Sequence, residues 1–398
     1  MSEAVIVSAV RTPIGRANKG VLREVRADDL AAFAIKTAVE RVPQLDRSLI
    51  EDVILGCAFP EGEQGMNLAR IVGALAGLPE TAGGVTVNRF CASSLQAFNM
   101  AAQSIMLDLG EAIVAGGVES MSRVPMGGFN PSFNPRLSKA HEGEDLRSAY
   151  PPCELEYGYS SYIPMGMTAE NLAREYKISR EAQDAFALRS HQRAIAAIDT
   201  GVFKREIVPV PLPDGRLMEV DEGPRRDTSL ERLGSLEPAF IKGGSVTAGN
   251  SSPLNDGASA VVLMSAQKAR DMGITPLAKV RAMAVAGVSP DVMGIGPVPA
   301  MRKLLQRSGL QLSDIDIIEI NEAFAAQTLS VVQAMGIDEE KLNPHGGAIA
   351  LGHPLGSSGA RLIATLINDL QTANKTLGIA TLCVGGGQGV ATLIERMS

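Results

Sequence analysis

Short runs rich in β-branched residues alternate with alanine-rich segments near both ends of the chain. The strand-like runs are residues 4–10, 51–59, 83–88, 111–117, 278–288, 315–324 and 378–387. Apolar residues recur at intervals of three and four, which predicts amphipathic helices, in the segments 30–42, 93–108, 299–309 and 360–371. Strands that alternate with helices are typical of α/β folds, so the chain is predicted to form α/β layers.

The two ends of the chain resemble each other in the order of their elements. Residues 48–59 and 313–324 each run from an acidic helix start into an apolar strand. Residues 111–120 and 378–389 each form a strand that ends in a glycine turn. These pairs indicate a divergent internal duplication. The alternative is that α/β segments look alike in sequence, and the pattern alone leaves both readings open.

The composition changes in the middle block, from about residue 122 to 251. Its first part is rich in Pro, Gly, Ser and Tyr and is predicted to form irregular loops. Two helical stretches follow at 168–176 and 179–198, with Thr168 and Ser179 as the expected N-caps. We interpret the block as an insertion that covers part of the molecule.

Composition and charge narrow the classes of protein to which the chain could belong. Apolar residues make up 45% of the chain and charged residues 20%, as in ordinary soluble proteins. The net charge of −7 argues mildly against a nucleic-acid partner. Apolar runs are far shorter than the roughly 18 residues that span a membrane. The first residues lack a signal-peptide pattern, so we expect a cytoplasmic protein.

The four cysteines lie far apart and form no CxxC pair, which disfavours a zinc site and a disulfide framework. They are Cys57, Cys91, Cys153 and Cys383. Cys91 stands between a strand-like run and a helical segment. Unpaired N–H groups and the helix dipole at such a junction are expected to lower the thiol pKa and favour a nucleophilic thiolate. On position alone, catalytic and structural roles for Cys91 are equally weighted.

Two of the four histidines lie in the glycine-rich segment 343–361. Neighbouring glycines and a proline place His353 on a tight turn that a ligand can approach closely. A thiol nucleophile needs a base that titrates near neutrality, and histidine is the usual choice. His345 is the competing candidate, although its setting favours a structural role.

Two further segments place polar groups at strand ends. Cys383 precedes a turn of four glycines that begins at Gly385, and exposed N–H groups there suit an oxyanion. A dinucleotide fingerprint anchored at Gly385 fails because Val390 stands in the third glycine position, and no GxxxxGK[ST] loop is present. Asn321 follows another strand, where it can hold a water, donate to an oxyanion or simply cap a helix.

Together these segments resemble the thiolase family over essentially the whole chain. The motifs that carry the resemblance occur in the family's order: RTPIG, VNRFCASSLQA, VTAGNSSPLNDGA, INEAFAAQ, NPHGGAIALGHPLGSSGAR and CVGGGQG. The resemblance implies an α/β fold of two similar halves in five layers, α-β-α-β-α, with a loop domain inserted in the first half. The expected boundaries are 1–121 and 252–273 for the first half, 122–251 for the inserted domain and 274–398 for the second half.

The resemblance also implies roles at matching positions. Cys91 is similar to the family's nucleophile and His353 to the base that activates it. Cys383 resembles the second cysteine, which moves a proton to or from the α-carbon of acetyl-CoA. Asn321 would hold a water in one oxyanion hole together with His353, and the N–H groups of Cys91 and Gly385 would form the other. The implied coenzyme A or pocket contacts are Arg225, Phe240, Ser252, Met165 and Phe324.

The implied activity is reversible cleavage of 3-ketoacyl-CoA to acetyl-CoA and a shortened acyl-CoA through an acyl-cysteine. Coenzyme A would then be a co-substrate, with no permanently bound cofactor. The resemblance implies a homodimer or homotetramer. It leaves open a stable complex with a partner that catalyses the hydratase and dehydrogenase steps. One alternative is an acetyl-CoA C-acetyltransferase specific for acetoacetyl-CoA, and another is a non-catalytic acyl-CoA-binding subunit.

Two departures from the family pattern bear on these alternatives. Members acting on acetoacetyl-CoA commonly have His-Met-Gly where this chain has Pro164, Met165 and Gly166, so the sequence favours a degradative thiolase. The nucleophile motif reads CASS where many members have a glycine at its second or fourth position. A decarboxylating ketoacyl synthase would carry His or Asn in place of Cys383, which speaks against that class.

Overall fold

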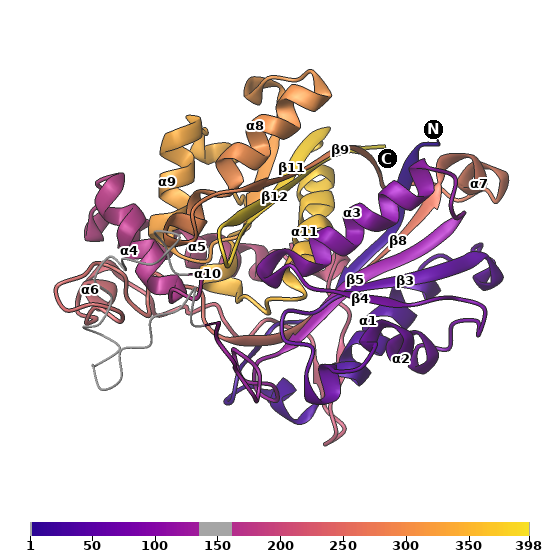
Figure 1. The fold of residues 1–398 in the computed structure, drawn as a ribbon, viewed down its shortest axis with the longest axis horizontal. Helices are drawn as coiled ribbons and strands as arrows, with labels where there is room; N and C mark the ends of the chain where they lie inside the picture. Colours follow the sequence, from indigo (N-terminus) through magenta and orange to yellow (C-terminus); the bar gives the residue numbers. More distant parts are fainter. Residues whose placement is uncertain (1, 135–160, 398) are drawn as a thin grey trace.

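The computed structural model describes residues 2–134 and 161–397. The predicted Pro- and Tyr-rich loop lies largely outside these ranges, and so does Cys153. Within the described residues, strands from the two ends of the chain lie side by side at the centre of the molecule, with helices around them (Figure 1).

Five strands of the first half form a mixed sheet in the order β4-β3-β5-β8-β1. β3 is parallel to both β4 and β5, whereas β8 is antiparallel to β5 and to β1. The strands are β1 (Ala4–Arg11), β3 (Ile50–Gly56), β4 (Val85–Val87), β5 (Ala112–Ser120) and β8 (Asn255–Ser265).

Four strands of the second half repeat this arrangement in the order β10-β11-β12-β9. β10 is parallel to β11, and β12 is antiparallel to β11 and β9. They are β9 (Ala278–Gly287), β10 (Ile317–Ile320), β11 (Leu377–Val384) and β12 (Gln388–Arg396). β10 therefore corresponds to β3 and β11 to β5, as the paired sequence segments predict, and the duplication is confirmed.

The two sheets meet at β1 and β9, where Val5 pairs with Lys279 and Ile6 with Ala278. This short antiparallel contact joins both sets of strands into one continuous ladder. The N-terminal strand thus lies at the boundary of both halves and is buried along nearly its whole length.

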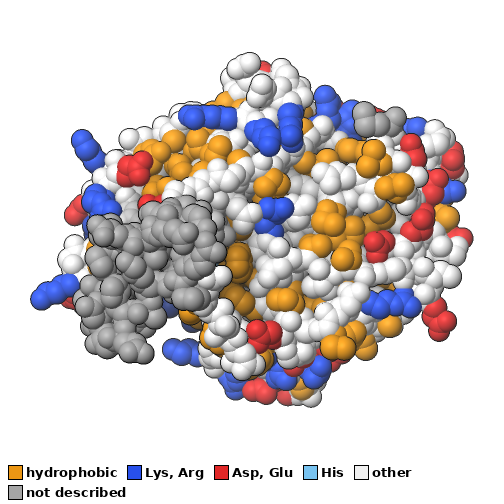
Figure 2. All heavy atoms as spheres, in the orientation of Figure 1, with side chains coloured by type: hydrophobic (Ala, Val, Ile, Leu, Met, Phe, Trp, Pro, Cys, Tyr) orange, Lys and Arg blue, Asp and Glu red, His pale blue; other side chains and the backbone are white. Residues whose placement is uncertain are grey.

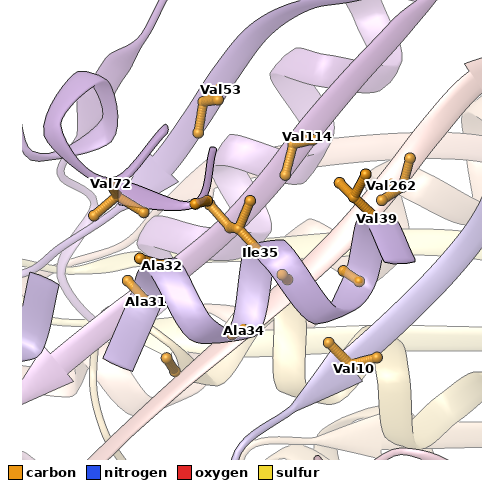
Figure 3. Packing of buried hydrophobic residues seen from close by; sticks show 14 of the residues in the cluster. Val10, Ala31, Ala32, Ala34, Ile35, Val39, Val53, Val72, Val114 and Val262 are labelled. Atoms are coloured by element: carbon orange, nitrogen blue, oxygen red, sulfur yellow. The ribbon is translucent and has the colours of Figure 1, made fainter. Parts of the chain in front are cut away.

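Helices α1 (Ala27–Glu40) and α2 (Leu68–Leu75) cover the outer face of the first sheet. Alanines of α1 allow a close approach to the strands, and Ile35 and Val39 pack into one apolar cluster with Val114 and Val262 (Figure 3). Each fully buried aliphatic side chain of this kind contributes about 1.5–3 kcal/mol to stability. Period-3.6 spacing in the sequence thus translates directly into this packed face.

A central layer lies between the sheets and consists of α3 (Ser93–Met106) and α11 (Ser358–Thr372). Gly359 permits their close contact, because a Cβ there would lie 2.2 Å from the Leu95 nitrogen. On the outer face of the second sheet lie α8 (Pro297–Ser308) and α9 (Ala325–Met335). The five predicted layers are confirmed.

The middle block adds helices α4 (Met165–Glu175), α5 (Arg180–Asp199) and α6 (Leu230–Gly234) and the short hairpin β6 (Val210–Pro211) and β7 (Leu217–Met218). Ser179 caps α5 as predicted, since its side chain accepts from the Ala182 N–H. The predicted cap at Thr168 is wrong. α4 starts earlier, after Pro164, and the Thr168 hydroxyl donates to the Met165 carbonyl inside the first turn. The exact domain boundaries stay a prediction.

The remaining short elements are β2 (Gly15–Arg16), α7 (Ala266–Asp271) and α10 (Ala348–Leu351). None of the helices in the described part of the chain combines the length and apolarity required to cross a membrane. Figure 2 shows apolar side chains reaching the surface across the middle of one face, with charged side chains mostly toward its edges.

Candidate active site

Cys91 lies in a tight turn between β4 and α3, as the sequence predicts. The turn is a 3-10 helix over Phe90–Ala92, and Phe90 has a φ of 41°, a left-handed conformation that is strained for a bulky residue. The Ser93 hydroxyl stabilises the turn, because it accepts from the Arg89 N–H at 2.9 Å and donates to the Phe90 carbonyl at 2.7 Å. The first serine of the CASS motif, Ser93, therefore supports the turn that holds the thiol.

The thiol of Cys91 is not a preformed thiolate. Burial raises its pKa to about 11, and this desolvation outweighs the backbone N–H groups of Gly385 and of Cys91 itself, which lower the pKa. The expectation that the helix start lowers the pKa of this thiol is wrong, because the helix donors act on a sulfur removed from water. Cys91 must therefore lose its proton to a base when it attacks.

His353 lies on the turn that precedes α11, with its ring buried among polar partners. Its backbone N–H donates to Asn255 Oδ1 at 2.9 Å, and Nδ1 lies 2.6 Å from Ser358 Oγ. On the other edge of the ring, Nε2 lies 3.2 Å from Asn321 Nδ2. Burial, with a smaller contribution from the positive charge of Arg361, lowers the His353 pKa to about 3. The imidazole is thus neutral near pH 7 and able to accept a proton.

Asn321 directly follows β10 and is fully buried. Its Nδ2 contacts His353, while its Oδ1 has no hydrogen-bond partner among the described residues. A buried amide oxygen of this kind requires a polar partner. This arrangement brings together two of the residues assigned by resemblance and leaves one polar atom free for a ligand or a water.

Cys383 is the penultimate residue of β11 and is buried, and Gly385 lies two residues later. Burial raises the pKa of the Cys383 thiol well above its ordinary value, and ionisation of the nearby Cys91 raises it further. A Cβ placed on Gly385 would lie 3.6 Å from the Met165 sulfur and 3.7 Å from the Phe90 ring. Two thiols of high pKa therefore flank a backbone N–H that is directed at the Cys91 sulfur.

Glu119 connects the segment after β3 with the histidine turn, and sequence reasoning did not single it out. Its buried carboxylate accepts from the N–H groups of Ala58 at 2.8 Å and Gly356 at 2.9 Å, and from Gln64 Nε2 at 2.8 Å. The only sequence signal is an acidic residue at the end of an otherwise apolar strand. Asn255 and Ser358 also escape sequence reasoning, because their partners become visible only in three dimensions.

Four of the five predicted coenzyme A or pocket residues lie close together. Met165, Phe240 and Phe324 belong to one apolar cluster with Cys383, and the two phenylalanine rings meet edge to face at 6.0 Å. The Ser252 N–H donates to the carbonyl of Ala323, beside Phe324. Arg225 is exposed, and its backbone N–H contacts His191 rather than this cluster.

His345 lies apart from these groups. Its Nδ1 pairs with the buried Asp369, and its ring contacts Phe203 edge to face. This setting fits the structural role that the sequence favours. Among the described residues, no group of three or more His, Cys, Asp or Glu side chains is arranged to hold a metal ion.

Family models and relatives agree with this geometry. Residues 4–267 match the thiolase N-terminal domain and residues 274–396 the thiolase C-terminal domain. The chain belongs to the thiolase family. A 3-ketoacyl-CoA thiolase of Bacillus subtilis is 48% identical over 99% of this chain and 100% of its own length. A beta-ketoadipyl-CoA thiolase of Pseudomonas aeruginosa is 50% identical, and the match covers 99% of both chains.

Solved thiolase structures share the fold. The human mitochondrial 3-ketoacyl-CoA thiolase in complex with CoA superposes with a TM-score of 0.88 at 39% identity, covering 100% of this chain and 98% of that one. The likeness extends over both halves and the inserted domain, so the thiolase fold predicted from the sequence motifs is confirmed.

Proposed function

We propose that this thiolase cleaves 3-ketoacyl-CoA to acetyl-CoA and a shortened acyl-CoA, and catalyses the reverse condensation. The observation that supports this proposal most directly is the pair of buried thiols, Cys91 and Cys383, on either side of the Gly385 turn. Carbon–carbon cleavage needs a nucleophile and a separate proton donor for the carbanion that leaves. Two thiols with one neutral histidine supply both without a metal.

In the first half-reaction, His353 accepts the Cys91 proton as the sulfur attacks the 3-keto carbon. The N–H groups of Cys91 and Gly385 are oriented toward this sulfur and would stabilise the oxyanion. The bond between C2 and C3 then breaks, and its electron pair leaves as the acetyl-CoA enolate. Cys383, which its raised pKa keeps protonated, gives the proton to C2.

In the second half-reaction, the acyl group leaves Cys91. The sulfur of a free coenzyme A attacks the thioester while the Cys383 thiolate takes its proton. The Cys91 sulfur then leaves and takes back the proton held by His353, which restores all three groups. In the first half-reaction, Asn321 would hold a water beside His353 that donates to the oxygen of the acetyl-CoA enolate, which its unpartnered buried Oδ1 supports. The scheme is ping-pong with coenzyme A as co-substrate.

The inserted domain would bind the coenzyme A chain and the acyl chain. Met165, Phe240 and Phe324 offer an apolar wall beside Cys383, with Ser252 at its edge. Gly166 is required there, because a Cβ would lie 2.2 Å from the Phe240 ring. Arg225 would meet the nucleotide phosphate from the surface, which its exposed guanidinium supports.

Thiolysis of 3-ketoacyl-CoA substrates of increasing chain length tests this function. Pro164 in place of the histidine common in acetoacetyl-CoA enzymes leads us to expect that 3-ketohexanoyl-CoA and longer substrates exceed acetoacetyl-CoA in kcat/KM by about tenfold. Burial of two further methylenes corresponds to about 1.6 kcal/mol, which is more than tenfold. If kcat/KM were highest for acetoacetyl-CoA, the acetoacetyl-CoA-specific acetyltransferase would be favoured. If it were highest for a substrate with a terminal carboxylate, the activity named for the Pseudomonas relative, a beta-ketoadipyl-CoA thiolase, would be favoured.

Replacement of the two histidines separates the base from its competitor. His353→Ala is expected to lower kcat/KM for thiolysis at neutral pH at least about 100-fold, whereas His345→Ala retains most of the activity. Because burial lowers the His353 pKa to about 3, the wild-type rate should show no loss around pH 6.5, and acid should inactivate only as the pH falls toward that value. Comparable losses in both variants would contradict the assignment.

We propose that the protein acts in the cytoplasm as a homodimer or homotetramer. β4 is the edge strand of the first sheet, and exposed apolar side chains lie on it and nearby, at Met66, Ile71, Leu75 and Val85. An exposed edge strand with apolar neighbours favours pairing with a second chain. Association with hydratase and dehydrogenase partners stays a prediction. Reduced, unpaired Cys57, Cys91 and Cys383 suit a reducing compartment.

A further inference from the structure

Both polar edges of the His353 ring have a partner in the protein. Nδ1 lies 2.6 Å from Ser358 Oγ, and Nε2 lies 3.2 Å from Asn321 Nδ2. A neutral imidazole carries one ring proton, so one edge donates and the other accepts. Which nitrogen holds the proton decides whether Nε2 can act as a base, and the neighbours of the ring set this choice.

The Ser358 hydroxyl decides the direction of these bonds. Its single hydrogen points to the Pro354 carbonyl, with Oγ 2.8 Å from that oxygen, and a carbonyl can only accept. The Ser358 oxygen is then available as an acceptor for Nδ1–H of His353. The lone pair of Nε2 in turn accepts from the Asn321 amide, so one arrangement satisfies all these contacts.

The opposite tautomer would break this arrangement. A proton on Nε2 would require the Asn321 amide to turn over, and the Ser358 hydrogen would have to leave the Pro354 carbonyl for Nδ1. Ser358 is fully buried in the first turn of α11, where water does not compete for its hydroxyl. The helix start therefore holds the serine in a fixed position relative to the ring.

We propose that Ser358 is a positioning residue that fixes His353 in the Nδ1–H tautomer and leaves Nε2 unprotonated as the base. This inference rests on the proposed role of His353 as the base that activates Cys91. Ser358 touches neither substrate nor thiol in this scheme and acts through the imidazole alone. Partners that orient a metal-bound histidine commonly contribute one to two orders of magnitude, and we expect the same range for Ser358.

Kinetics of neighbouring serine variants provide the first test. Ser358→Ala is expected to lower kcat for thiolysis about 10- to 100-fold, with KM for 3-ketoacyl-CoA little changed. Ser358→Thr keeps the hydroxyl and should restore most of that rate. Ser357→Ala is the matched control: Ser357 is equally buried, its Oγ contacts Ser259 Oγ at 3.0 Å, and its loss should leave kcat near wild type.

The tautomer itself can be measured by 15N NMR on protein labelled at histidine. The chain has four histidines, and the His353 signals are assigned by their loss in His353→Ala. Wild type is expected to carry the proton on Nδ1, and Ser358→Ala to shift the population toward Nε2–H. This measurement on wild type remains decisive even if Ser358→Ala does not fold.

The outcomes separate this inference from the proposed function. An Nε2–H tautomer in wild type, or a Ser358→Ala variant with the rate of Ser357→Ala and an unchanged tautomer, would overturn the role of Ser358. In both cases a large loss in His353→Ala would still support His353 as the base. If His353→Ala kept the wild-type rate, the proposed function of His353 itself would be wrong.

Discussion

Cys91→Ser is expected to lose thiolysis and acyl transfer together, by about 10⁵- to 10⁶-fold in kcat, as when the nucleophile of a hydrolase is removed. A serine hydroxyl is far less acidic than a thiol, and burial already raises the pKa of Cys91 to about 11. A neutral His353 with a pKa of about 3 is a weak base. It can draw a proton from a thiol during attack, but far less readily from a hydroxyl.

The acyl adduct provides the direct measurement. After incubation with an acyl-CoA, mass spectrometry of wild type should place the acyl group on Cys91, and Cys91→Ser should show none. Cys57→Ser is the matched control, because Cys57 is also a buried thiol but its sulfur faces Glu119 rather than the Gly385 turn. An adduct found only on Cys57, Cys153 or Cys383 would contradict the assignment. Absence of any adduct in an otherwise folded wild type would favour the acyl-CoA-binding subunit.

The parts of the site that could be predicted from sequence are those set by local order along the chain. Cys91 lies at a strand-to-helix junction because β4, the turn and α3 follow one another within a few residues. The same holds for Cys383 at the end of β11 and Asn321 at the end of β10. Periodicity likewise predicts the central helices, whose apolar faces are determined by neighbouring residues.

The contacts that sequence reasoning missed join residues far apart in the chain. Glu119 reaches the Gly356 N–H, and Asn255 accepts from the His353 N–H 98 residues away. Only the packing of the two halves creates these bonds. The pKa of Cys91 was misjudged for the same reason, since helix-start donors are a local feature and burial depends on the whole fold.

Cys383→Ala is expected to separate the two half-reactions. The variant should still acylate Cys91 from a simple acyl-CoA, because that step forms no carbanion and leaves Cys91, His353 and the Gly385 N–H in place. Cleavage and condensation of the carbon–carbon bond should fall at least about 1,000-fold, because the enolate loses its proton donor. Exchange of deuterium into the methyl group of acetyl-CoA should fall with them.

Methyl exchange followed by NMR, together with the acyl adduct on Cys91, measures both halves in one preparation. Cys57→Ala removes another buried thiol and should retain both reactions, which controls for the cavity left by the substitution. Burial keeps Cys383 protonated, so the thiol can give a proton to the carbanion. Wild-type methyl exchange in Cys383→Ala would show that another group carries the proton, and Cys383 would then be a structural cysteine beside the glycine turn.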